Sequence, residues 1–214
     1  MNIELDEVEA RVVGCLIEKE ATTPDYYPLT VNALIAACNQ KTNRNPVVDY
    51  NEDIVTKALD SLRDKNLVYV LFGGSSRVAK YKHLVPKILE LKYPEVAAIC
   101  VLLLRGPQTL GEIKARTSRL YSYDDIGQVE ETLRALEKRD EPLIVNLGRQ
   151  PGQKEARFAH LLSGEVEIDE VGFQQVVSTS SKSKVADLET EVSDLREKLE
   201  HLRDEFDEFK SKFE

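Results

Sequence analysis

The sequence predicts a mainly helical α+β fold in which three helices and a two-stranded β-hairpin occur twice and are followed by a coiled-coil helix. Three observations support this fold: a repeated order of apolar-periodic segments, a Gly-Gly or Pro-Gly hairpin turn near the end of each copy, and a late apolar heptad. The predicted boundaries are 1–88 for the first domain, 89–164 for the second, 165–184 for a linker and 185–213 for the coiled-coil helix.

The first copy reads as helix, helix, helix, strand, turn, strand. Apolar residues at helical spacing predict helices within 5–24 and 27–40. The segment 53–71 then passes from a helix into a β-branched strand, and FGGSS at 72–76 separates it from a second strand at 77–84. A threonine near the start of the second helix is a suitable N-cap.

The second copy repeats this order. It has helical segments at 91–109 and 109–120, a helix that passes into a strand over 127–147, the turn RQPGQK at 149–154 and a strand at 155–161. The apolar stripe of its first helix is broad enough to pack on two sides, so we expect contact with the first copy. Residues that match between the copies are Leu59 with Leu133, Leu62 with Leu136, Tyr81 with Phe158 and His83 with His160.

Three helices followed by a two-stranded hairpin is the order of a winged helix-turn-helix domain. Each copy has about 75–85 residues, a size at which one small core can fold. The sequence therefore predicts two tandem winged helix-turn-helix domains. The matched histidines indicate a shared structural role in the hairpins and not a catalytic one.

The segment CNQKTNRNP at 38–46 is expected where the second helix of the first copy ends. Leu5 matches Leu91 at an offset of 86 and Leu59 matches Leu133 at an offset of 74, so the first copy is 12 residues longer, and we place the insertion here. Two interpretations stay open. The segment is either an asparagine turn that bonds to itself or a surface that binds a partner.

The charge is unevenly distributed along the chain. The formal net charge is −9, with −2 in residues 1–90, +1 in 91–164 and −8 in 165–214. Since non-specific DNA binding relies on neutralising phosphates, two nearly neutral domains lower the expectation of tight non-specific binding.

The chain shows no signal-peptide pattern and no apolar run of the roughly 18 residues that a membrane helix needs. We therefore expect a cytoplasmic protein that does not bind a membrane. Three cysteines without paired spacing argue against disulfides, and we expect Cys15 and Cys100 to be buried thiols. No zinc spacing, phosphate loop or catalytic motif is present. We expect a non-enzymatic protein without a cofactor.

The third helices are poor candidates for reading DNA because their exposed positions mix acids and bases. Positive charge is expected in the hairpins and in the second helix of the second copy, where it could contact phosphates; an ordinary mixed surface is the alternative. The candidate contacts to nucleic acid or a partner are Lys41, Asn43, Arg44, Arg77, Lys80, Arg116, Arg119, Arg149, Lys154 and Arg157.

The last part of the chain carries apolar residues at alternating spacings of three and four over about four heptads, which indicates a coiled coil. Three of four interhelical charge pairs would attract in a parallel homodimer. The alternative is a helix that folds back on its own domain. The candidate dimerisation residues are Val185, Leu188, Val192, Leu195, Leu199, Leu202, Phe206 and Phe209.

Three stretches, ARVVGCLIEKEATTPDYYPLTVNALIAACNQKTNRNPV, LLLRGPQTLGEIKAR and RQPGQKEARFAHLLSGE, resemble the YceH-like family of bacterial proteins. The resemblance covers about residues 3–168 and the tail. It implies a tandem pair of winged-helix domains in a bacterial cytoplasm, but no reaction and no catalytic residues.

Two functional hypotheses follow. The first is a dimeric winged-helix protein that binds DNA or modulates transcription. The second is a protein-interaction module, in which the winged helices and the acidic coiled coil dock a partner. Because one fold serves many functions, the fold alone does not decide between them.

Overall fold

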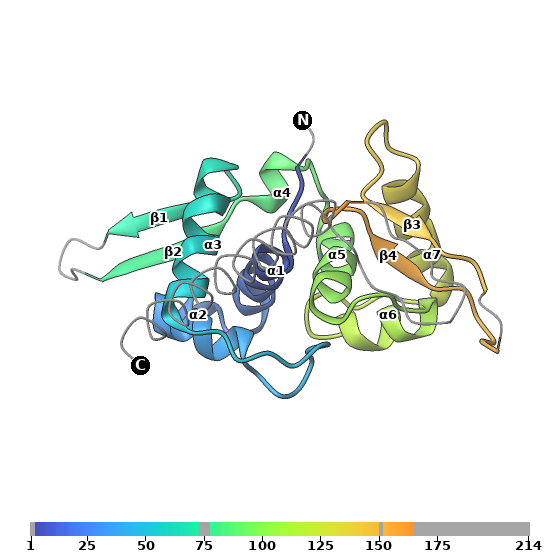
Figure 1. Ribbon diagram of the computed structural model, residues 1–214. Coiled ribbons are helices and arrows are strands. Elements are labelled where there is room, and N and C mark those ends of the chain that lie inside the picture. The colour runs from blue at the N-terminus through green and yellow to red at the C-terminus, as the bar shows by residue number, and fades with distance from the viewer. Residues whose placement is uncertain (1–2, 73–77, 150–151, 165–214) are drawn as a thin grey trace, which may run out of the picture. The chain divides into compact units, whose positions relative to one another are not determined.

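The computed structural model describes residues 3–72, 78–149 and 152–164 (Figure 1). The chain divides into a unit Met1–Val176, which holds all the described residues, and a unit Val177–Glu214. The predicted linker at 165–184 and the predicted coiled coil at 185–213 lie outside the described residues, so both stay predictions.

The described residues form a mixed α+β fold with two small antiparallel hairpins, as predicted. We call the elements from α1 to β2 the first half and those from α5 to β4 the second half. The first half comprises α1 (Glu7–Thr22), the 3₁₀ turn η1 (Pro24–Tyr26), α2 (Val31–Cys38), α3 (Glu52–Asp64), β1 (Val68–Phe72) and β2 (Ala79–His83).

The short helix α4 (Val85–Ile88) joins the halves. The second half comprises α5 (Tyr93–Arg105), α6 (Leu110–Thr117), α7 (Ile126–Glu137), β3 (Ile144–Asn146) and β4 (Phe158–His160). Helix, helix, helix, strand, strand is thus the order in both halves.

The hairpins of the two halves have the same register. Val68 of β1 lies opposite His83 of β2, and Ile144 of β3 lies opposite His160 of β4. The second strand of each hairpin also bridges to a residue just before the second helix, Leu29 to Tyr81 and Gln108 to Phe158. Equivalent pairing therefore ties each hairpin to its own helices.

Side chains at the N-terminal ends fix where the helices begin. Thr30 accepts a hydrogen bond from the Ala33 N–H at the start of α2, and Thr109 accepts one from the Glu112 N–H at the start of α6. The predicted threonine caps are thereby confirmed. Such caps satisfy backbone donors that have no partner inside the helix.

One hydrophobic core runs through both halves. The matched leucines Leu59, Leu62, Leu133 and Leu136 are all fully buried, as their spacing predicted. Figure 1 shows α1 and α5 next to each other at the centre of the described part, and these two helices share the largest set of contacts between elements. The broad apolar stripe of α5 is buried there, which confirms the expected contact with the first copy.

Gly14 of α1 makes this close packing possible. A Cβ atom at Gly14 would lie 2.8 Å from Leu104 Cδ2 and 3.2 Å from Leu103 Cβ of α5. The Cys100 Sγ donates to the Gly14 carbonyl at 3.4 Å. Cys15 and Cys100 are buried free thiols, as predicted.

The 12 extra residues of the first half do not all lie at 38–46, so that prediction is corrected. Helix α1 has 16 residues and α5 has 13, which accounts for three. The connection from α1 to α2 is four residues longer than that from α5 to α6. Residues 39–51, which we call the long connection, number 13 against eight between α6 and α7, so only five of the extra residues lie there.

Within the described ranges, no helix is both long and apolar enough to cross a membrane. The same ranges contain no group of three or more His, Cys, Asp or Glu side chains placed to hold a metal ion.

Candidate functional site

Arg44 anchors the long connection inside the protein. Its side chain is completely buried and forms a two-pronged ion pair with Glu18 of α1, at 3.0 Å and 2.6 Å. It also donates to the carbonyls of Ala37 and Asn43 and to Oε1 of Gln40. Since its donors are all engaged, Arg44 is an internal anchor and not the surface contact that the sequence predicted.

The ion pair between Arg44 and Glu18 is shielded from solvent, because their side chains are 0% and 14% exposed. Burial alone would raise the pKa of Glu18, but hydrogen bonds from Arg44 and its charge overcome burial and hold the pKa below its usual value. Glu18 thus stays charged, and its charge is matched by Arg44.

The long connection also contacts the second half. The Asn45 N–H donates to the Leu104 carbonyl at 2.9 Å, and its side-chain amide donates to the Arg105 carbonyl at 3.4 Å. The Arg105 guanidinium in turn donates to Oδ1 of Asn43. Carbonyls at the end of α5 have no partner within the helix, so the connection satisfies groups that would otherwise need water.

This arrangement differs from an asparagine turn that bonds to itself, and binding of a partner by 38–46 stays a prediction. Asn43 has a φ of 61°, a conformation that asparagine tolerates. However, the segment bonds mainly to α1, α2 and α5 and not to itself. Buried Arg11 of α1 adds to this by donating to the carbonyls of Cys38 and Pro46. The segment joins the halves.

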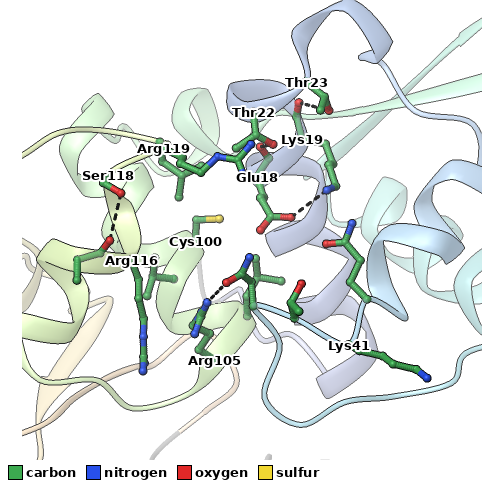
Figure 2. A pocket seen from close by; sticks show the side chains of 17 residues that line it. Glu18, Lys19, Thr22, Thr23, Lys41, Cys100, Arg105, Arg116, Ser118 and Arg119 are labelled. Carbon is green, nitrogen blue, oxygen red and sulfur yellow. Dashed lines mark hydrogen bonds and ion pairs between the residues drawn. The ribbon is translucent and has the colours of Figure 1, made fainter.

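A cavity of about 550 Å³ opens between α1 and the long connection on one side and α5 and α6 on the other (Figure 2). We call it the junction cavity. Its charged lining residues are Glu18, Lys19, Lys41, Arg105, Arg116 and Arg119. Five cations thus face one carboxylate, and that carboxylate is already paired with Arg44.

The cations differ in how far they are neutralised inside the protein. Lys19 lies 3.4 Å from Glu18, and Arg116 lies 3.2 Å from Glu112 of α6. Lys41 and Arg119 are exposed and have no ion-pair partner among the described residues. In Figure 2 Lys41 points away from Cys100, so it lies at the rim.

Arg105 lies close to other positive charges, and its pKa reflects this. Burial lowers the pKa of this guanidinium, and the positive charges of Arg116 and Arg44 lower it further. A negative ligand would relieve this repulsion.

The predicted contact residues fall into separate places. Arg77 lies outside the described residues, Arg44 is internal, and Arg157 donates to Glu112 and to the Pro107 carbonyl. The residues that the junction cavity brings together are Lys41, Asn43, Arg116 and Arg119. Lys80, Arg149 and Lys154 lie apart from the cavity, exposed on or beside the hairpins.

Sequence reasoning missed Glu18, Lys19 and Arg105 as residues of this site. Lys19 and Arg105 occupy the last turns of α1 and α5, where basic residues commonly offset the helix dipole. Their sequence context therefore gave no reason to single them out, and only the packing of α1 on α5 brings them together.

The first hairpin has an exposed basic and aromatic face. Tyr69 pairs with Lys82 and Leu71 with Lys80 across the strands, so these four side chains share one face. The Lys82 ammonium lies 5.8 Å from the centre of the Tyr69 ring. Figure 1 shows this hairpin extending away from the helices.

The second hairpin carries exposed cations of its own. Arg149 and Lys154 lie in the β3–β4 connection and have no ion-pair partner among the described residues. Within the described ranges, both hairpins therefore carry exposed cations without an ion-pair partner.

The third helices carry more acid than base on their exposed positions, as the sequence indicated. On α3 the exposed acids are Glu52, Asp53, Asp60 and Asp64. Arg63 of α3 is paired with Asp60 and Arg134 of α7 with Glu130, so little free positive charge is left on either helix.

The matched histidines are both buried but differ in their surroundings. His83 Nε2 lies 2.8 Å from Glu20 Oε2, and this contact is the main reason that the pKa of Glu20 is lowered. Complete burial lowers the pKa of His160 to about 4, and its Nδ1 has no hydrogen-bond partner within the described residues. His160 is thus neutral at pH 7.

Comparison with known proteins identifies the relatives of this chain. Residues 5–153 match a family model described as "Protein of unknown function, DUF480". A UPF0502 protein of Pelobacter propionicus is 56% identical over 169 residues, which cover 79% of this chain and 77% of the relative.

UPF0502 proteins of Opitutus terrae and Geobacter sulfurreducens are 52% and 50% identical. Their matches cover 77% and 78% of this chain and 72% and 76% of the relatives. The chain therefore belongs to the DUF480/UPF0502 family of bacterial proteins, which confirms the resemblance to the YceH-like family.

Proposed function

We propose that each half is a winged helix-turn-helix domain and that the protein binds DNA, or modulates transcription, by holding the phosphate backbone with its hairpins. The supporting observation is the pair of equivalent hairpins, whose cations Lys80, Arg149 and Lys154 have no ion-pair partner among the described residues. In a winged helix the hairpin contacts the backbone beside the groove.

Affinity for phosphates and selection among sequences are separate properties. The acidic exposed face of α3 opposes close approach to the major groove, and α7 offers few free cations. We therefore expect binding that depends strongly on salt and weakly on base sequence. The exposed cations of the two hairpins supply the charge for this phosphate binding. In this proposal the protein acts by binding and not by catalysis.

The test is fluorescence anisotropy with a labelled DNA duplex, using the full chain over a range of salt concentrations. The variants are Lys80→Gln with Lys82→Gln, and Arg149→Gln with Lys154→Gln. Each phosphate contact contributes about 0.9 to the slope of log K against log salt, so each double variant should flatten the slope by up to about 2. The loss should be similar for unrelated sequences.

The matched control is Lys57→Gln, which removes an exposed cation from α3 and should leave the slope unchanged. Absence of binding at micromolar protein and low salt would contradict DNA binding. An equal effect of Lys57→Gln would contradict the assignment to the hairpins.

A second candidate function is docking of a protein partner. It is favoured by the acids of α3 and by two exposed apolar residues beside the first hairpin turn, Phe72 at 76% and Val78 at 55% exposure. The coiled-coil and homodimer predictions for 185–213 belong to this candidate as well.

Affinity purification from the native cell would test docking. A stoichiometric partner that is recovered by the full chain and lost when residues 185–213 are removed would support it, and loss with Phe72→Ser would place the contact at the first hairpin. An empty or tail-independent recovery would contradict it.

A further inference from the structure

We propose that the junction cavity binds a small organic phosphate, with the phosphate held by arginines of the second half and the organic part against an apolar floor. This site is distinct from the hairpin surfaces assigned to DNA, and it does not depend on them. Its residues come from both halves of the described chain.

The size of the junction cavity suits a small molecule. Its volume is about 550 Å³, within the roughly 300–1,000 Å³ typical of ligand pockets. Helices and the anchored long connection form its walls (Figure 2). Because Arg44 fixes that connection through Glu18, the site is built before a ligand arrives.

The charge of the junction cavity selects an anion. Ends of three helices, α1, α5 and α6, lie at the cavity, and each C-terminal end carries about −0.5 of an elementary charge. Basic residues in the last turns offset these ends. Lys19 is paired with Glu18 and Arg116 with Glu112, but Lys41, Arg105 and Arg119 have no ion-pair partner among the described residues. Their three positive charges exceed the three half-charges, and Arg44 neutralises Glu18.

The arrangement of donors favours phosphate over a simple halide-like anion. Arg119 makes no hydrogen bond or ion pair with another described residue, so its N–H groups are open. Arg105 is oriented by its bond to Asn43 and keeps further N–H groups available. Guanidinium forks of this kind match the oxygens of a phosphate.

Hydroxyl groups at the junction cavity are less available as donors. Thr22 and Thr23 donate to the carbonyls of Glu18 and Lys19, and Ser118 donates to an α6 carbonyl. Thr42 also lines the cavity, and its hydroxyl makes no hydrogen bond with another described residue. Recognition of the phosphate therefore falls mainly to the arginines, with Lys19 and Thr42 as further donors.

The floor of the junction cavity is apolar. It includes Cys100, Val101 and Leu104 of α5 and Leu120 after α6. The first three are 0–4% exposed and Leu120 is half-buried, so a base or an aliphatic chain would cover mainly Leu120. The two features together point to an organic phosphate.

The test is isothermal titration calorimetry of the full chain with ATP, with pyrophosphate as the charge-only probe and adenosine as the apolar-only probe. We expect saturable one-to-one binding of ATP, tighter than that of either part. Arg119→Gln should weaken ATP binding roughly 10-fold or more, as the loss of a hydrogen bond between charged groups does. Because Arg119 is exposed and has no partner in the described part of the chain, this variant should keep the wild-type melting temperature.

Arg149→Gln is the matched control: it removes an exposed arginine that has no ion-pair partner among the described residues and does not line the cavity, and it should change ATP affinity less than twofold. No saturable heat with ATP or pyrophosphate at millimolar concentration would overturn the proposal, as would equal effects of the two variants.

Measuring DNA-duplex binding with the same variants distinguishes this proposal from the proposed function. If Arg119→Gln weakens DNA binding while ATP fails to bind, the cavity is part of a nucleic-acid surface and the ligand proposal is overturned. If ATP binds and DNA does not, the ligand proposal stands and the proposed function fails.

Discussion

The two halves share an order of elements and differ in how the second helix is joined to the third. In the second half eight residues suffice, whereas the first half uses the 13-residue long connection. Those additional residues reach the end of α5, where Asn45 bonds to Leu104 and Arg105. Where two copies of a fold pack together, an insertion in one can serve the contact between them.

The largest expected effect tests the anchor that holds the long connection. Arg44→Ala leaves the mostly buried Glu18 without its partner, and it should lower the free energy of unfolding by about 3–5 kcal/mol. Urea denaturation followed by circular dichroism measures this. The second half offers the control Arg134→Ala, which removes an exposed pair and should cost no more than about 1 kcal/mol.

A loss of less than about 1 kcal/mol for Arg44→Ala would show that the long connection is not held by this pair. The double variant Glu18→Gln with Arg44→Met should lose less than the sum of the single changes, because it leaves no unpaired charge.

The second effect concerns the matched histidines. The pKa of His160 is about 4 in the folded protein and about 6.5 when unfolded, so the unfolded chain binds more protons between these values. Stability should therefore fall as the pH drops from about 6.5 to 4, by about 3 kcal/mol at most.

Chemical denaturation at several pH values, for the wild type and His160→Gln, isolates this effect. The difference in unfolding free energy between the two proteins should shrink or reverse in favour of the variant as the pH falls. A constant difference from pH 7 to pH 4 would mean that burial of His160 does not oppose its protonation.

A smaller effect tests the close approach of α1 and α5. Gly14→Ala places a methyl group against Leu104 and should lower stability by about 1–2 kcal/mol, after the gain in helix propensity is counted. Gly111→Ala on α6 is the matched control: its Cβ meets nothing closer than 4.0 Å, so it should be neutral or stabilising. Thermal melting distinguishes the two, and equal melting temperatures would contradict the tight contact.

The smallest expected effect is the difference between the stability losses caused by removing the N-cap threonine of α2 and that of α6. Thr30→Ala and Thr109→Ala each remove the N-cap bond of a second helix, and each should cost about 1 kcal/mol. The two losses should agree within about 0.5 kcal/mol, because each change removes the same hydroxyl bond to the third helical N–H, while the Glu112 bond back to the Thr109 N–H can remain. A clearly larger loss for one of them in urea denaturation would show that the repeat is less regular at these helices than the geometry indicates.

Features encoded by nearby residues were predictable from the sequence. The threonine caps and the spacing of Leu59, Leu62 and Leu133 depend on neighbours within a turn or two, so their signals survive in a single sequence. The paired strands on either side of each predicted turn and the broad stripe of α5 are of the same kind. These sufficed to place the helices and strands of both halves.

Features that depend on distant residues were not predictable. The burial of Arg44 requires Glu18, 26 residues earlier in the chain, and an arginine among asparagines ordinarily indicates a surface turn. The junction cavity requires α1 to pack on α5. The prediction that all 12 extra residues lie at 38–46 was wrong, because the matched leucines on either side show how many residues are added between them but not where.

The glycine contact between α1 and α5 has a consequence for how the protein comes apart. Gly14 of α1 meets Leu103 and Leu104 of α5 within one continuous core. Dividing the chain after residue 88 would therefore expose the apolar face of α1 in one fragment and that of α5 in the other. Heat should therefore melt both halves in a single cooperative transition with matching calorimetric and van't Hoff enthalpies. A single transition would mean that the two halves fold as one unit in spite of their repeated order of elements.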